Sequence, residues 1–111
     1  MSINETYLSN VKSEACSIAQ SLLVADEGYI DKVGRMWILG QEIHGEVWGT
    51  EFHVFGVAAS DTDHLPTEKV RSLYAPEALR RADRELAEYI ESSRDEIEQG
   101  CRRILEKYGS T

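Results

Sequence analysis

The sequence has few of the residues from which disulfide scaffolds, cysteine-ligated metal sites and membrane spans are built. Its 111 residues include only two cysteines and two prolines, and aromatic residues make up 8% of the chain. No run of apolar residues approaches the ~18 that a membrane span needs. Cys16 and Cys101 do not have the spacing of a zinc or redox motif. We therefore expect no disulfide framework, no metal or cofactor held by cysteine, and no membrane partner.

The common catalytic motifs are also missing. No Gly-x-Ser-x-Gly, phosphate loop, dinucleotide fingerprint or His-Glu-x-x-His sequence occurs. Their absence argues against an ordinary enzyme, and we expect no cofactor. The first residues lack the basic and apolar segments of a secretory signal. Both cysteines fall within helical patterns and are typical of small buried hydrophobic residues in a reducing compartment. We expect a cytoplasmic protein.

Positive charge is scarce. The chain has twelve Lys and Arg residues and twenty Asp and Glu residues, which gives a formal net charge of −8. Such a chain repels phosphate backbones, so we expect no nucleic acid as a partner. Acids outnumber bases nine to two over residues 26–68, whereas nine acids and seven bases nearly balance over 76–111. The acidic middle favours a basic protein partner, with a merely solvated surface as the alternative.

Apolar spacing predicts an all-α fold. Apolar residues recur at steps of three and four over 4–24, 29–43 and 76–108, and Pro76 occupies a favoured first position of a helix. Gly40 lies on an apolar stripe, where a missing side chain allows another helix to approach closely. We expect three shorter helices packed along one long C-terminal helix, within a single domain covering residues 1–111.

Residues 45–59 combine strand propensity with helical spacing. A lone strand would have no partner, so we favour a short helix over 50–59, with Thr50 as its N-cap. The four residues at helical spacing are Trp48, Phe52, Phe55 and Ala59. The aromatic residues Trp37, Trp48, Phe52 and Phe55 are more typical of a core than of a pocket wall.

Polar chemistry is concentrated in the Ser-Asp-Thr-Asp-His-Leu-Pro run at 60–66. Asp61, Asp63 and His64 there could bind a cation or a partner, but a calcium loop would need a glycine and a closing glutamate that are missing. The alternative is a structural turn in which Asp and Ser side chains bond nearby backbone groups. We favour the turn.

Arg71 and Tyr74 follow directly and form a second candidate binding site. An arginine near Asp61 and Asp63 could form a bidentate bridge that fixes this connection onto the body of the protein. The functional alternative is that Arg71 holds a carboxylate or phosphate group of a ligand. We favour the bridge.

The run at 60–66, with Val70, Arg71, Tyr74 and the Ala-Pro-Glu-Ala-Leu sequence at 75–79, resembles a segment of a family of small bacterial proteins of unknown function. Members carry a Ser-Glu-Thr-Asp-x-Leu-Pro turn, an arginine, an aromatic residue and a long C-terminal helix. The likeness extends loosely over residues 52–105, and Asp61 stands where the family usually has glutamate. The resemblance implies a bacterial source and a helical fold, and assigns no activity.

Two functions remain open. The first is a non-enzymatic protein-binding module of inhibitor or immunity type, whose acidic face covers a basic surface of its partner. The second is a small metal- or ligand-binding enzyme centred on Asp61, Asp63, His64 and Arg71.

The long apolar stripe of 76–108 also bears on assembly. It is longer than the other helices can easily cover, which favours a homodimer over a monomer in which helix 4–24 lies antiparallel along it. The residues expected at the dimer interface are Ile97, Cys101, Ile104, Leu105 and Tyr108.

Overall fold

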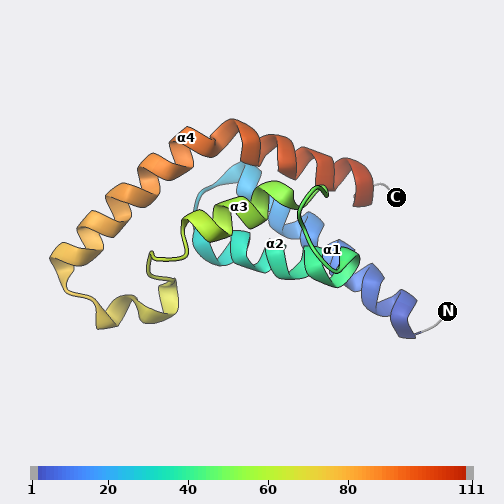
Figure 1. Ribbon diagram of the computed structural model, residues 1–111, viewed down its shortest axis with the longest axis horizontal. Coiled ribbons are helices and arrows are strands. Elements are labelled where there is room, and N and C mark those ends of the chain that lie inside the picture. The colour runs from blue at the N-terminus through green and yellow to red at the C-terminus, as the bar shows by residue number, and fades with distance from the viewer. Residues whose placement is uncertain (1–2, 110–111) are drawn as a thin grey trace.

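The structure, a computed structural model that describes residues 3–109, is built from helices alone. Its elements are α1 (Ile3–Val24), α2 (Tyr29–His44), α3 (His53–Asp61), a short 3-10 helix η1 (Glu68–Leu73) and α4 (Pro76–Tyr108) (Figure 1). The predicted all-α class, with shorter helices along one long C-terminal helix, is confirmed. The sequence pattern did not predict η1. None of the helices between residues 3 and 109 is both long and apolar enough to cross a membrane.

Residues 45–59 form a loop and then a helix, but α3 begins at His53 rather than at Thr50. The Thr50 hydroxyl donates to the Val47 carbonyl at 2.6 Å and accepts from the Phe52 N–H at 3.1 Å. Thr50 therefore closes the turn that leads into the helix instead of capping the helix itself. Phe52 and Phe55 are fully buried, as expected of core residues, whereas Trp48 remains 45% exposed.

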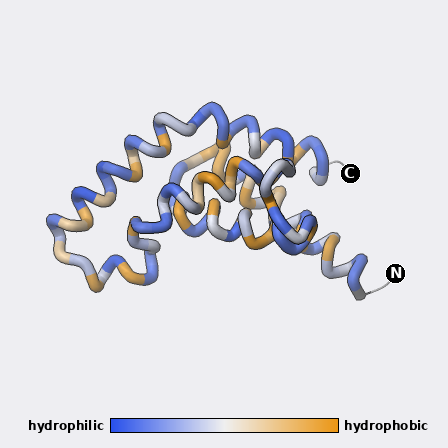
Figure 2. Tube along the Cα trace, in the orientation of Figure 1, coloured by the Kyte–Doolittle hydropathy of each residue, from blue (hydrophilic) through white to orange (hydrophobic). Residues whose placement is uncertain are grey.

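The core lies where α1, α2, α3 and the C-terminal half of α4 meet (Figure 2). The Lys12 ammonium lies 5.5 Å from the centre of the Tyr108 ring, and the Cys16 Sγ lies 4.0 Å from the Ile104 carbonyl. As residue numbers rise along α1, those of the facing residues on α4 fall. The two helices are therefore antiparallel, as the monomer alternative expects.

This packing corrects the predicted dimer interface. Ile97, Cys101 and Ile104 are at most 5% exposed within one chain, and Leu105 and Tyr108 pack against the same core. The chain's own α1 covers the stripe, so these five residues form a core and not a surface for a second copy. A homodimer through another surface stays a prediction.

The N-terminal half of α4 is different. From Pro76 to Tyr89 no residue of the helix is buried, and Ile90 is the first that is. This half extends beyond the other helices, next to η1, and the molecule measures 52 × 27 × 23 Å (Figure 1). The long axis is close to the ~50 Å expected for a helix of this length.

Two glycines allow close packing between elements. A Cβ atom on Gly40 would lie 2.7 Å from side-chain atoms of Val47 and Phe52, so the predicted close approach is real. It is made by the connection before α3 and not by another helix. A Cβ on Gly100 would overlap the Val54 side chain, so this glycine lets α3 lie directly on α4.

Candidate functional site

Polar residues at the end of α3 and after it bond to three residues on two successive turns of α4. The Tyr89 hydroxyl donates to Asp61 Oδ2 at 2.9 Å, and the His64 imidazole is hydrogen bonded to the Glu85 carboxylate. Arg71 donates through both terminal nitrogens to Asp83, at 2.8 and 2.9 Å. These contacts fasten residues 61–71 to the N-terminal half of α4.

The bridge predicted for Arg71 has a different partner from the expected one. Arg71 is bidentate, but its acid is Asp83 on α4 and not Asp61 or Asp63. The apolar spacing of α4 does not show which of its acids face η1. The bond holds the pKa of the Asp83 carboxyl below its usual range.

The candidate site residues between positions 60 and 74 do not converge on one point. Asp61, His64 and Arg71 each have their own partner on α4, and no side-chain hydrogen bond or ion pair joins Asp63 or Tyr74 to the rest of residues 3–109. Within the same range, no group of three His, Cys, Asp or Glu side chains has the geometry to hold a metal ion. The arrangement is that of an anchored connection.

Asp63 instead lines a groove between α2 and the turn after α3, here called the α2 groove, with a volume of about 410 Å³. Its walls include the residues Asp31, Gly34, Trp37, Ile38, Asp63 and Leu65. Ile38 is 47% exposed, and a Cβ on Gly34 would meet nothing within 4 Å. An apolar surface is therefore open to solvent in a groove that two carboxylates, Asp31 and Asp63, also line.

Neither carboxylate of the α2 groove is neutralised within residues 3–109. The arginine that lines the groove, Arg35, donates instead to both oxygens of Glu14, at 2.6 and 2.9 Å. That bond lowers the pKa of Glu14 and keeps the pair charged. The carboxylates of Asp31 and Asp63 are therefore available to a cationic group that enters the groove.

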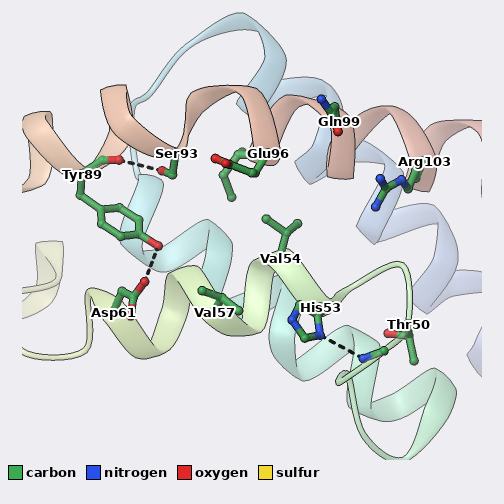
Figure 3. A pocket seen from close by; sticks show the side chains of 12 residues that line it. Thr50, His53, Val54, Val57, Asp61, Tyr89, Ser93, Glu96, Gln99 and Arg103 are labelled. Atoms are coloured by element: carbon green, nitrogen blue, oxygen red, sulfur yellow. Dashed lines mark hydrogen bonds between the residues drawn. The ribbon is translucent and has the colours of Figure 1, made fainter.

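A larger cleft of about 600 Å³, here called the α3–α4 cleft, is lined by residues of α3 and α4 (Figure 3). Its apolar part is formed by Val54, Val57 and Ile97. Burial, and then the hydrogen bond to Asp61, raises the pKa of Tyr89, so the phenol stays protonated.

The polar groups of the α3–α4 cleft differ along its length. His53 lies toward the Thr50 end, where its Nδ1 accepts from the Gly49 N–H at 3.0 Å. An imidazole that accepts through Nδ1 carries its proton on Nε2, which leaves one donor for a ligand. Arg103 is also at this end, while Glu96 lies between it and Tyr89 (Figure 3).

The sequence pattern missed a polar cluster around Glu51. The Glu51 carboxylate is bonded to His44 Nε2 at 2.7 Å, to Lys107 Nζ at 3.3 Å and to the Tyr108 hydroxyl. Burial raises the pKa of Glu51, but the hydrogen bonds from His44 and Tyr108 outweigh it and lower the pKa to about 2. A carboxylate this acidic is a poor general base near neutral pH, so its chemistry suits a structural latch. No spacing rule connects residues so far apart in the chain.

The cysteines do not form a reactive site. Both are free thiols, Cys101 buried and Cys16 partly buried. Burial raises the pKa of Cys101 to about 12, so it remains a thiol at neutral pH and packs as a small hydrophobic residue, as the sequence indicated.

Comparison of the chain with models of known protein families, with curated proteins and with solved structures gives no match. The resemblance carried by residues 60–79 therefore stays a prediction.

Proposed function

We propose that this chain is a non-enzymatic protein-binding module of inhibitor or immunity type, acting in the bacterial cytoplasm by covering a basic surface of another protein. The observation that carries the proposal is the α2 groove, which combines exposed apolar surface at Ile38 with two unpaired carboxylates, Asp31 and Asp63. Protein interfaces commonly have an apolar centre and a polar rim. A lysine or arginine flanked by apolar side chains complements this groove.

The balance of charge supports a basic partner. Several cations of the chain are already engaged, Arg35 by Glu14, Arg71 by Asp83 and Arg94 by Asp26. Complementary charge accelerates association and orients the partners more than it adds affinity. Binding through the α2 groove should therefore be fast at low salt and weaken as salt rises.

The enzyme alternative has less geometric support. Asp61, His64 and Arg71 are each occupied by a different residue of α4, so a substrate or metal would have to break three contacts to bring them together. Melting temperatures measured with and without Mg²⁺, Mn²⁺, Ca²⁺ or Zn²⁺ provide the test. A rise that Asp63→Ala abolishes would favour the enzyme over the binding module.

The binding module is tested with a matched pair of double variants. Asp31→Asn with Asp63→Asn removes both carboxylates of the α2 groove, whereas Glu88→Gln with Asp95→Asn removes two exposed acids of α4 and causes the same change in net charge. Pull-downs from bacterial lysate at low salt are quantified by mass spectrometry, and a carbodiimide cross-linker then joins carboxylates to partner lysines.

We expect wild type and the α4 variant to retain the same basic protein, cross-linked at Asp31 or Asp63, and the groove variant to lose most of it. Recovery of no basic protein would contradict the proposal. Equal loss in both variants would also contradict it, because net charge alone would then explain retention.

A further inference from the structure

The two ends of the α3–α4 cleft carry opposite charges. Asp61 lies at one end, where it accepts from the Tyr89 hydroxyl, and Glu96 lies between Tyr89 and Arg103 (Figure 3). Arg103 lines the other end. Neither Glu96 nor Arg103 forms an ion pair within residues 3–109, so both charges are free to meet a ligand (Figure 3).

The surface between these charges is apolar and accessible. Val54, Val57 and Ile97 form it, and Val57 on α3 is 38% exposed. The volume of about 600 Å³ is within the range of pockets that bind small molecules. A ligand that fits must therefore have an apolar middle, a cationic end and an anionic end.

The spacing of the charges limits the length of that ligand. Glu96 and Arg103 are seven residues apart on α4, which corresponds to about 10 Å along a helix. Three residues of extended peptide also span about 10 Å. The ammonium and carboxylate of a free tripeptide thus have about the separation of Glu96 and Arg103.

We propose that the α3–α4 cleft binds short apolar peptides whose two termini are free. The terminal ammonium is held by Glu96, the terminal carboxylate by Arg103, and the side chains lie on the valines of α3. The Nε2–H of His53 donates to a peptide carbonyl. The site is separate from the α2 groove and does not depend on the function proposed for it.

The proposal is tested with four forms of the tripeptide Leu-Ala-Leu: free, N-acetylated, C-amidated and modified at both ends. Titrations are followed by the amide NMR shifts of ¹⁵N-labelled protein at low salt. We expect the free peptide to bind with shifts confined to α3 and residues 89–103. Each modification should weaken binding about fivefold, the effect of losing roughly 1 kcal/mol from an exposed charge pair.

Variants of the chain then assign each terminus. Glu96→Gln should remove the effect of N-acetylation and keep that of amidation, and Arg103→Gln should do the reverse. Asp95→Asn and Arg102→Gln are exposed neighbours outside the cleft and should change neither. Val57→Trp, which fills the cleft from a partly exposed position, should prevent binding of all four peptides while the circular dichroism spectrum stays helical.

The proposal is overturned if the four forms bind with equal affinity, because the termini would then play no part. It is also overturned if no form binds at millimolar concentration, or if the shifts map to the α2 groove.

Discussion

The two halves of α4 share one continuous helix but are held in place by different forces. The C-terminal half buries Ile97, Cys101 and Ile104 against α1. The half from Pro76 to Tyr89 buries no residue and is fastened by Asp83, Glu85 and Tyr89 to the connection after α3. Helical periodicity is thus sufficient to predict a helix but does not show which part of it another element covers.

The difference has an energetic consequence. Burying an aliphatic side chain contributes about 1.5–3 kcal/mol, and the C-terminal half does this on several turns. Exposed ion pairs contribute little, because solvent screens them and long side chains lose freedom. The C-terminal half should therefore be as stable as the whole molecule, and the N-terminal half should open alone.

The largest expected effect comes from placing a charge in the covered half. Ile104 is fully buried, so Ile104→Asp should lower the free energy of unfolding by more than about 4 kcal/mol and unfold the monomer. Leu79→Asp, on the uncovered half, should cost less than about 1 kcal/mol. Urea denaturation followed by circular dichroism measures both. Equal losses of unfolding free energy in the two variants would contradict the difference between the two halves of α4.

The next effect concerns the polar cluster around Glu51, which acts as a latch at the end of the covered half of α4. The Glu51 pKa is lowered from 4.5 to about 2, so its stabilisation is complete above pH 4.5 and is lost as pH falls through 2. Glu51→Gln should therefore reduce stability by about 2 kcal/mol at pH 7. The difference from wild type should vanish near pH 2.

Glu106→Gln is the control for this latch, since Glu106 is an exposed acid of the same end of α4. Thermal melts of the three proteins between pH 2 and pH 7 provide the measurement. A Glu51→Gln variant as stable as the Glu106→Gln variant at pH 7 would contradict the latch.

The smallest effect is expected from the polar contacts of the uncovered half. Arg71→Ala should leave the midpoint of global unfolding almost unchanged, because the Arg71–Asp83 pair is largely exposed. It should still accelerate amide exchange over residues 77–86 roughly tenfold, since one of three fastenings is lost. Asp83→Ala should have the same effect, and the double variant should add little to either. Additive effects would show that the two residues do not act as a pair.

Local patterns predicted the helices well, because apolar spacing and the position of Pro76 are local features. They placed the start of α3 three residues early, since Thr50 satisfies backbone groups in a turn as readily as at a helix start. The interface assigned to Ile104 and its neighbours was wrong because periodicity marks an apolar face without naming the element that covers it.

The candidate sites were less predictable than the helices. The run at 60–66 was predicted to be a turn in which Asp and Ser side chains bond nearby backbone groups, whereas the structure shows Asp61 and His64 bonded to side chains of α4. Their partners, and the cluster at Glu51, join residues distant in sequence, which no local spacing encodes. The α3–α4 cleft likewise depends on how two helices pack against each other, which residue spacing within one helix does not encode.

Hydrogen exchange along α4 tests the central claim most directly. The account predicts that amides of residues 97–104 exchange only through global unfolding, with a free energy equal to that of the whole protein. Amides of residues 80–88 should exchange through a smaller opening, with a lower free energy and a weaker dependence on denaturant. Equal free energies and equal denaturant dependence in both halves would contradict the account.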